Sequence, residues 1–407
     1  MNGISSKVKV EFYEDSLLPK RQLKLQSAEL TNQGRVLVVI NDEKLQFPGE
    51  YLLRFCECAK CFSSACLSHI RSLSDLYKAD LSLKSVTMSE DGKYIEYVAT
   101  NDHSGRFTAE WLYNRRMTQQ GWEERNAAVF LHKPCSWPVA DKMHVEKATY
   151  SEVTETEMGM QKFINNLIKD GLFIITGTPD RRVADEFGEK TGLAPIMNHY
   201  GPNWIVENVP VPTNHAYSSY ALDLHIDQAF LMHCPNIQLL HCMTQSEVGG
   251  ESIMSDGIRA ANLLKERHPE YFHILTTLEI NQKDVISHYN QQQYYVANRS
   301  PTIVLNKDGD PVKFMFNSVA QSSFFSGSPE QYEEYERATK AFVGLLNECS
   351  ITFRNEPGDI MVFDNERVLH GRASYDKRYE RKLEGWYLSW DMMHSRLRVS
   401  NIKTAQN

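Results

Sequence analysis

The sequence lacks any apolar run long enough to cross a membrane. Its longest runs, such as residues 36–40 and 172–175, are a fraction of the roughly 20 residues that a membrane-spanning helix needs. The opening stretch, MNGISSKVKVEFYEDS, has no apolar segment of the kind found in secretory signals. It also carries acidic residues ahead of the first arginine, Arg21, which argues against a mitochondrial transit peptide. We therefore expect a cytoplasmic protein with no membrane partner.

Basic residues are also in short supply. The chain has 44 Lys and Arg against 52 Asp and Glu, a formal net charge of −8, and no long basic run. Because a nucleic-acid-binding surface needs a basic patch, we expect no nucleic acid partner. Internal repeats and low-complexity segments are absent as well, and 407 residues fit two domains, one small and one large.

Short strands dominate both predicted domains. Residues 1–115 contain alternating runs such as RVLVVI and KYIEYVA and predict a small β-rich domain. Residues 116–145, with Pro134 and Pro138, predict a linker. Residues 146–407 combine many short strand-like runs with a few helices, two of them at about 256–268 and 329–347. This pattern favours a mainly β fold, a barrel or jelly roll with packing helices, over a doubly wound sheet.

The second domain opens on a predicted helix. Thr149 or Ser151 is suited to cap it, and apolar residues then recur at helical spacing as far as Gly171, which ends the helix. The strand-like run LFIITG follows at once.

Two histidines and one carboxylate predict an iron site. In the tripeptide His225-Ile226-Asp227 the first and third side chains share one face of a strand. His370 follows a second strand-like stretch, PGDIMVFDNERVL. Two imidazoles and one carboxylate on one side of a metal leave three positions open, which is typical of Fe(II) oxygenases. An H-x-D tripeptide alone occurs by chance in many chains, so the prediction depends on the third ligand.

An arginine beyond the triad indicates a second anchor. Arg381 begins the strand-like run RKLEGWYLSW, eleven residues after His370. A guanidinium grips a carboxylate through two parallel hydrogen bonds, which is what the distal carboxylate of 2-oxoglutarate requires. The alternative is a surface salt bridge from Arg381 to a neighbour such as Glu384.

Three cysteines crowd together in the first domain as Cys56, Cys58 and Cys61. Thiolates this close repel one another unless a cation neutralises them, and Zn(II) does so with tetrahedral sulfur and nitrogen ligands. The fourth ligand is open on spacing alone, with candidates at Cys66, His69 and His103. Because a closed four-ligand site has no place for substrate, we expect a structural zinc. The alternative is a set of reduced, buried cysteines.

Seven segments together carry a resemblance to a known family: FCECAKC, NDHSGRFTAEWL, NHYGPNW, HIDQ, IQLLHCMTQSEVGGES, NEPGDIMVFDNERVLHGRASY and RKLEGWYLSWDMMHSRLR. Over nearly its whole length the chain resembles the γ-butyrobetaine dioxygenase family, which also contains trimethyllysine dioxygenase. The resemblance implies a double-stranded β-helix catalytic domain, an N-terminal zinc domain, a homodimer and support of activity by ascorbate. The ligand sets it implies are Fe(II) on His225, Asp227 and His370, 2-oxoglutarate on Arg381, and zinc on Cys56, Cys58, Cys61 and His103. One departure is Ile226, where relatives have a small polar residue, and its side chain should point away from iron.

The resemblance also implies an aromatic cage for a quaternary ammonium, made by Tyr200, Trp204, Tyr217 and Tyr387. The chemistry supports this, because a trimethylammonium group carries charge but no N–H donor and is attracted to aromatic faces. Arg381 and Tyr387 are six residues apart and so face the same side of a strand, with Trp386 on the other side. Asn214 and Asn317 are implied near the substrate carboxylate; the alternative for both is a turn-forming role.

These expectations combine into one predicted reaction on a small quaternary-ammonium carboxylate. With Fe(II), O2 and 2-oxoglutarate, the enzyme would hydroxylate γ-butyrobetaine to L-carnitine and release succinate and CO2, the last step of carnitine biosynthesis. The nearest alternative is 3-hydroxylation of trimethyllysine, which carries an amino acid in place of a simple carboxylate; the C-terminal segment and the opening residues favour γ-butyrobetaine. A third possibility, from another class, is a non-catalytic module that binds methylated lysine, although such a module has no use for the triad and Arg381.

Overall fold

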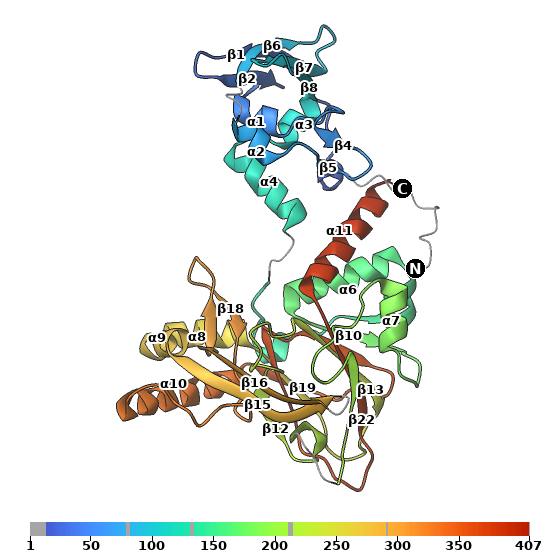
Figure 1. The fold of residues 1–407 in the computed structure, drawn as a ribbon. Coiled ribbons are helices and arrows are strands. Elements are labelled where there is room, and N and C mark those ends of the chain that lie inside the picture. Colours follow the sequence, from blue (N-terminus) through green and yellow to red (C-terminus); the bar gives the residue numbers. More distant parts are fainter. Residues whose placement is uncertain (1–13, 79–81, 131–133, 211–214, 290–291, 407) are drawn as a thin grey trace. The chain divides into compact units, whose positions relative to one another are not determined.

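The computed structural model describes residues 14–78, 82–130, 134–210, 215–289 and 292–406. The chain divides into two compact units, Met1–Leu131 and His132–Asn407 (Figure 1). Their boundary lies inside the segment 116–145. The first unit continues into that segment through helix α4 (Gln119–Val129), whose N-cap Thr118 accepts a hydrogen bond from the amide of Gly121.

The first unit holds two three-stranded antiparallel sheets, ordered β1-β2-β3 and β6-β7-β8. The central strand β2 alternates as its sequence predicts, with Val36, Val38 and Ile40 fully buried. Side chains from both sheets share one core with the short helices. The elements are η1 (Glu14–Leu17), β1 (Leu25–Leu30), β2 (Arg35–Ile40), β3 (Glu43–Pro48), α1 (Gly49–Arg54), β4 (Phe62–Ser63), β5 (Ser68–His69), α2 (Leu73–Lys78), β6 (Leu83–Met88), β7 (Tyr94–Ala99), β8 (Ser104–Thr108) and α3 (Ala109–Asn114).

Two large sheets form the centre of the second unit, which also holds the two-stranded sheets β15-β16 and β17-β18. The larger has the order β11-β22-β13-β20-β10-β9, and the smaller has the order β12-β21-β14-β19. All neighbours are antiparallel except β9 and β10. The strands are β9 (Lys147–Thr149), β10 (Leu172–Thr176), β11 (Asn203–Glu207), β12 (Leu222–His225), β13 (Ile237–Thr244), β14 (Ser252–Asp256), β19 (Ser350–Phe353), β20 (Ile360–Asp364), β21 (Val368–Arg372) and β22 (Lys382–Leu388).

The two sheets pack face to face. Met254 and Val368 of the smaller sheet share a buried cluster with Leu240, Met361 and Leu383 of the larger one. Strands that are distant in sequence therefore alternate between two layers, as in a double-stranded β-helix, and the predicted jelly-roll architecture is confirmed. The space between the layers is filled by apolar side chains at one end and opens into a cavity at the other.

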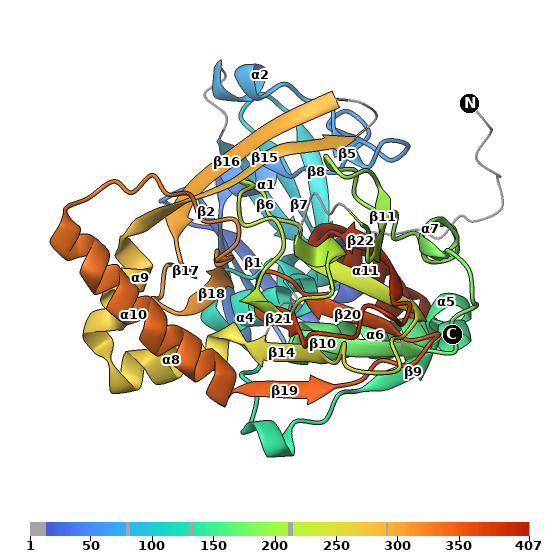
Figure 2. The ribbon, with the colours of Figure 1, turned by 90° about the horizontal axis from the view of Figure 1, so that it is seen from below.

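Helices cover both outer faces (Figures 1 and 2). Helices α6 and α11 pack against each other, α6 contacts β10 and β20, and α7 contacts β22. Helices α8, α9 and α10 form a second layer that shares a core with the smaller sheet. The remaining elements are η2 (Ala140–Lys142), α5 (Tyr150–Glu155), α6 (Glu157–Asp170), α7 (Ala184–Thr191), η3 (His215–Tyr217), α8 (Gly257–Arg267), α9 (Pro269–Thr277), β15 (Glu279–Tyr289), β16 (Gln292–Pro301), β17 (Ile303–Leu305), β18 (Pro311–Phe314), α10 (Pro329–Glu348) and α11 (Trp390–Gln406).

The helix predicted before Gly171 is in fact two helices. Thr149 caps α5 through a capping box with Glu152, but Thr156 then adopts an extended conformation (φ −126°, ψ 140°) and caps α6 in turn. Gly171 ends α6 in the left-handed conformation, at φ 69°. The two other predicted helices correspond to α8 and α10, whereas α9, which starts at Pro269, was not predicted.

None of the helices within the described ranges combines the length and the apolar character that a membrane crossing needs.

Candidate active site

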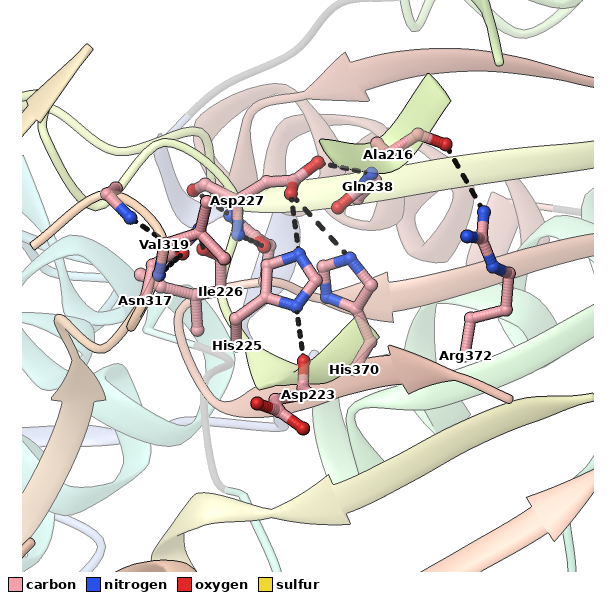
Figure 3. A network of polar contacts seen from close by, with 12 residues as sticks. Ala216, Asp223, His225, Ile226, Asp227, Gln238, Asn317, Val319, His370 and Arg372 are labelled. Atoms are coloured by element: carbon pink, nitrogen blue, oxygen red, sulfur yellow. Dashed lines mark hydrogen bonds and ion pairs between the residues drawn. The ribbon is translucent and has the colours of Figure 1, made fainter. Parts of the chain in front are cut away.

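Three metal-ligating side chains meet where β12 ends beside β21. His225 pairs with His370 across the two strands, and their ring centroids are 4.3 Å apart. Asp227 Oδ1 lies 3.3 Å from His225 Nε2 and 3.7 Å from His370 Nε2. Figure 3 shows the three side chains directed toward one another. Ile226 is fully buried in the apolar core on the opposite side, as its place between two inward residues requires.

Hydrogen bonds around the triad orient its ligand atoms. His225 Nδ1 donates to the carbonyl of Asp223 at 2.7 Å, which orients the ring so that its Nε2 faces the other two ligands. Asp227 Oδ2 accepts hydrogen bonds from Gln238 Nε2 at 2.7 Å and from the Tyr387 hydroxyl at 2.8 Å. Oδ1 is left facing the imidazoles. The carboxylate is therefore arranged to bind a metal through one oxygen while the protein holds the other.

A buried amide fixes the backbone of Asp227. Asn365 Oδ1 accepts from the Asp227 amide at 2.8 Å, and Asn365 Nδ2 donates to the Asp227 carbonyl at 3.0 Å. The same Nδ2 also donates to the Pro235 carbonyl at 3.0 Å. Asn365 is fully buried. Because both backbone groups of Asp227 are satisfied by one side chain, the ligand is held outside regular strand pairing without an unpaired polar group.

The electrostatics of the triad suit a divalent cation. Burial would raise the pKa of Asp227, but the hydrogen bond with His225 and the adjacent His370 hold that pKa well below its usual range. Burial, reinforced by the neighbouring His225, lowers the pKa of His370 to about 3. Burial would also lower the pKa of His225, but its hydrogen bond with Asp227 raises it overall. At neutral pH, Asp227 is therefore an anion and His370 a neutral ligand, the forms that bind metal.

A cavity of about 340 Å³ opens beside the triad. The triad residues, two arginines and several aromatic side chains line it. Arg372 donates to the carbonyls of Ala216, Ser218 and Tyr220, at 3.2, 2.7 and 2.6 Å, and so holds the segment that carries part of the wall. Figure 3 shows its contact with Ala216.

The second arginine, Arg381, is buried at the cavity wall. It is only 5% exposed, its Nε has no hydrogen-bond partner, and it forms no ion pair with any residue in the described part of the chain. The alternative pairing with Glu384 is wrong, because Glu384 points to the other face of β22 and accepts from the Val183 amide at 2.7 Å and from Arg182. An unpaired buried charge is costly. The cavity therefore fits a ligand that brings a carboxylate to Arg381.

All four predicted cage residues line the same cavity. Trp204 of β11 lies opposite Gly385 of β22, where a Cβ atom would come within 2.6 Å of the indole. The ring centroids of Trp204 and Tyr387 are 4.5 Å apart. Tyr217 lies on η3, and Tyr200 donates its hydroxyl to Asp284 at 2.6 Å. Gly385 is thus the residue that lets an indole ring lie flat against the sheet beside Tyr387.

The two predicted asparagines differ in what the structure reveals. Asn214 lies outside the described residues. Asn317 lines the cavity, but its amide is engaged with the backbone: Nδ2 donates to the Ile226 carbonyl at 3.2 Å, and Oδ1 accepts from Val319 and Ala320. These contacts match the turn-forming alternative, and they leave only one N–H of Asn317 for a ligand.

Comparison with known proteins decides the class of the enzyme. Residues 138–387, more than half of the chain, match the taurine catabolism dioxygenase TauD, TfdA family. The chain belongs to this family. It is an Fe(II)- and 2-oxoglutarate-dependent dioxygenase, and the alternative of a non-catalytic module that binds methylated lysine is excluded.

Individual relatives extend the similarity of this TauD/TfdA-family enzyme over both units. It is 28% identical over 382 residues to the γ-butyrobetaine dioxygenases of Pongo abelii and Homo sapiens, which covers 92% of this chain and 97% of theirs. It is 24% identical over 368 residues to the mitochondrial trimethyllysine dioxygenase of Rattus norvegicus, which covers 88% of this chain and 83% of that one. The resemblance inferred from the seven segments is confirmed.

The first unit of this dioxygenase brings the predicted zinc ligands together. The ligand atoms of Cys56, Cys58, Cys61 and His103 all lie within 4.8 Å of one another. His103 Nε2 is 3.4, 3.9 and 3.6 Å from the three sulfur atoms in chain order. Cys66 and His69, the other candidates for the fourth position, are exposed and outside this group. The donor set fits a tetrahedral zinc.

Sequence reasoning missed the residues that support the ligands and the cage, namely Gln238, Asn365, Arg372 and Asp284. Gln238 left a usable signal, because it is a polar residue inside the buried apolar strand IQLLHCMT. Asn365 left a weaker one, as an uncharged residue between Asp364 and Glu366. Asp284 left none, since its strand shows no pattern that distinguishes a cavity-facing acid from a surface one.

Proposed function

We propose that this enzyme hydroxylates γ-butyrobetaine to L-carnitine, coupled to oxidative decarboxylation of 2-oxoglutarate to succinate and CO2, as the last step of carnitine biosynthesis. The single observation that carries the proposal is the composition of one cavity. Four aromatic rings line it together with the metal triad and a buried guanidinium that no described anion neutralises. A substrate with a cationic head among the rings and a carbon chain that reaches the triad, together with 2-oxoglutarate on the guanidinium, fits those three features at once.

In this proposal each group has one role. His225, Asp227 and His370 hold Fe(II), and Arg381 binds the distal carboxylate of 2-oxoglutarate through its fork of N–H donors. Bound iron supplies the oxidation of a C–H bond by O2. The protein contributes position: Asp223, Gln238 and Tyr387 orient the ligands, and the cavity wall keeps water from the reacting carbon.

The aromatic rings support a quaternary ammonium over other cations. A primary ammonium seeks hydrogen-bond acceptors, whereas a trimethylammonium has no N–H and gains from aromatic faces, about 0.5–2 kcal/mol for each well-placed ring. The four rings come from three segments, with Tyr200 and Trp204 close together in sequence and Tyr217 and Tyr387 far from them, so the chain folds around the cation rather than presenting one strip of rings. Arg372 supports the wall near Tyr217 through its bonds to Ala216 and Ser218.

Trimethyllysine is the second candidate substrate, because it carries the same head group and trimethyllysine dioxygenases are among the relatives. The higher identity to γ-butyrobetaine dioxygenases, 28% against 24%, favours γ-butyrobetaine. Asn317 also favours the simpler carboxylate, since its amide keeps only one N–H for a ligand.

The deciding experiment loads the full-length protein anaerobically with Fe(II) and 2-oxoglutarate, then admits O2 in the presence of each substrate. We expect stoichiometric L-carnitine and succinate from γ-butyrobetaine and little hydroxytrimethyllysine from trimethyllysine. A larger yield from trimethyllysine would replace the proposal by its alternative. Succinate formed to the same extent with neither substrate present would reject both.

Three further properties belong to the proposal. Zinc on Cys56, Cys58, Cys61 and His103 would stabilise the first unit, because four ligand atoms already lie within 4.8 Å of one another. Ascorbate would sustain turnover by keeping iron reduced. A homodimer is expected from the resemblance, and sedimentation of the zinc-loaded protein tests it.

A further inference from the structure

One carboxylate in the cavity has no part in metal or 2-oxoglutarate binding. Asp284 lies on β15, the first strand of the long hairpin with β16 (Figure 2). It lines the same cavity as the four cage residues. Its side chain is 19% exposed, so most of its charge is shielded from bulk water and acts on what enters the cavity.

Asp284 is bound directly to the cage. Its Oδ2 accepts the hydroxyl of Tyr200 at 2.6 Å and the Nε2–H of His199 at 3.2 Å. The His199 ring in turn lies against Tyr200, with centroids 4.2 Å apart, and His199 is itself buried. Two donors on one oxygen fix the carboxylate beside the aromatic face of Tyr200.

Asp284 differs from the other charged residues that line the cavity. The described lining of the cavity holds three basic residues, Lys283, Arg372 and Arg381, and two carboxylates besides Asp284. Asp227 is committed to the triad, and Asp223 is exposed. In the proposed function 2-oxoglutarate neutralises Arg381, so Asp284 is the shielded carboxylate at the aromatic wall that an incoming cation meets.

We propose that Asp284 determines substrate specificity by making the cage select a permanently cationic head group over a neutral group of the same shape. This inference rests on the proposed function, and it assigns the preference for a quaternary-ammonium substrate to one residue. The carboxylate attracts the trimethylammonium across the cavity, where the low dielectric strengthens the interaction. Through its hydrogen bond it also draws charge onto the Tyr200 phenol, which makes that ring a better partner for a cation. A cage of four neutral rings would discriminate less.

The test compares Asp284→Asn with the wild-type enzyme on two substrates. Asparagine keeps the size of the side chain and an oxygen that accepts from Tyr200, but it removes the charge. The substrates are γ-butyrobetaine and 5,5-dimethylhexanoate, in which carbon replaces the quaternary nitrogen. We expect kcat/KM for the betaine to fall about tenfold, equivalent to about 1.4 kcal/mol, while kcat/KM for the neutral acid changes less than about threefold. The matched control is Glu279→Gln, an exposed acid on the same strand outside the cavity, which should leave both values unchanged.

The outcomes separate the two hypotheses. If wild-type enzyme oxidises neither substrate, the proposed function fails. If it prefers the betaine and Asp284→Asn keeps that preference, the proposed function stands and the role of Asp284 is rejected. An equal loss on both substrates would mean that Asp284 only holds the hairpin and also rejects its role. Should Asp284→Asn fail to fold, Asp284→Ser decides: it also removes the charge while keeping a small polar side chain, and an unchanged preference for the betaine overturns the inference.

Discussion

Asp227 works with its two oxygens in different environments. Oδ1 faces the imidazoles of His225 and His370, and Oδ2 is held by Gln238 and Tyr387. Tyr387 lines the cavity and donates its hydroxyl to Asp227. In the proposed site its ring would wall the cage while its hydroxyl supports the metal-binding carboxylate, because partners of this kind set the geometry and basicity of a ligand.

Tyr387→Phe separates those two functions. The ring stays, and Asp227 loses one of the two donors to Oδ2. We expect Fe(II) affinity to fall about tenfold, in the range seen when such supporting groups are lost, with a smaller change in the apparent affinity for substrate. Titration of the anaerobic Fe(II)–2-oxoglutarate charge-transfer band measures the iron affinity. Tyr217→Phe removes a hydroxyl from the same cavity that does not bond to Asp227 and should leave iron affinity unchanged; equal losses in both variants would argue against the support role.

Arg381 is a second residue whose surroundings make a clear prediction. Arg381→Met removes the charge at similar length. We expect the concentration of 2-oxoglutarate that gives the half-maximal rate to rise about 100-fold or more, because removing one partner of a buried charge pair leaves the other charge unpaired. The 2-oxoglutarate requirement of Arg381→Lys should lie between those of the wild type and Arg381→Met. A lysine keeps the positive charge but lacks the two parallel N–H donors of a guanidinium. Steady-state kinetics with varied co-substrate measure the change, and Arg378→Met, at an exposed arginine paired with Asp376, is the control. Unchanged co-substrate kinetics in Arg381→Met would remove the assignment.

At the scale of elements, strand β22 and Arg381, the residue before it, carry two of the groups that we propose to bind ligands. Its alternation sends Arg381, Gly385 and Tyr387 toward the cavity and sends Glu384 and Trp386 to the opposite face. There Trp386 packs against Phe187 of α7, with ring centroids 6.0 Å apart. The outer contacts hold the strand so that the Arg381 guanidinium and the Tyr387 phenol reach the cavity, and Gly385 leaves room for the indole of Trp204 on β11.

The junction of α5 and α6 offers a test of helix packing. Gly159 lies in the first turn of α6, and a Cβ there would overlap the carbonyl of Glu152 in α5. Gly159→Ala should therefore lower the free energy of unfolding by about 1–3 kcal/mol, even though alanine is the better helix former. Gly344→Ala, in the middle of α10 with nothing near its Cβ, should raise it by about 0.5–1 kcal/mol. Denaturant titration measures both, and a gain in stability for Gly159→Ala would contradict the close contact.

At the scale of the whole molecule, the described part of each unit contains one cluster of metal-ligating side chains, Cys56, Cys58, Cys61 and His103 in the first and the triad in the second. The sulfur atoms sit in a largely buried place, where burial raises the pKa of Cys56 to about 11. A bound cation would stabilise the thiolates of the cluster and so link their loop to His103, the residue that precedes β8.

The Cys61→Ser variant should therefore lose the zinc, and its first unit should unfold at a lower temperature than in the wild type. The triad in the second unit should keep its Fe(II) affinity, because none of its ligands comes from the first unit. Metal analysis together with thermal unfolding measures both effects. Cys66→Ser is the control, at an exposed cysteine outside the group; loss of zinc in that variant instead would make Cys66 the fourth ligand in place of His103.

Local patterns in the sequence determined a large part of this protein. Alternation predicted many of the strands and the shared face of Arg381 and Tyr387, and helices were predicted at the places of α8 and α10. Residue chemistry predicted the triad and the three clustered cysteines, whereas the fourth zinc ligand, His103, came from the resemblance. Spacing did not separate α5 from α6, because one extended residue, Thr156, is enough to divide them. It also did not predict α9.

Tertiary structure alone decided which residues support the site. Gln238, Asn365 and Asp284 act through partners 11, 138 and 84 residues away, and such contacts leave no period or spacing in a sequence. The pairing of β12 with β21 brought His225 beside His370, and the fold gave Arg381 no anion from the described part of the chain. The sequence determines which chemical groups the chain contains and which face of an element they share. Only the packing of distant elements determines which charges the protein itself neutralises and which are left for a ligand to neutralise.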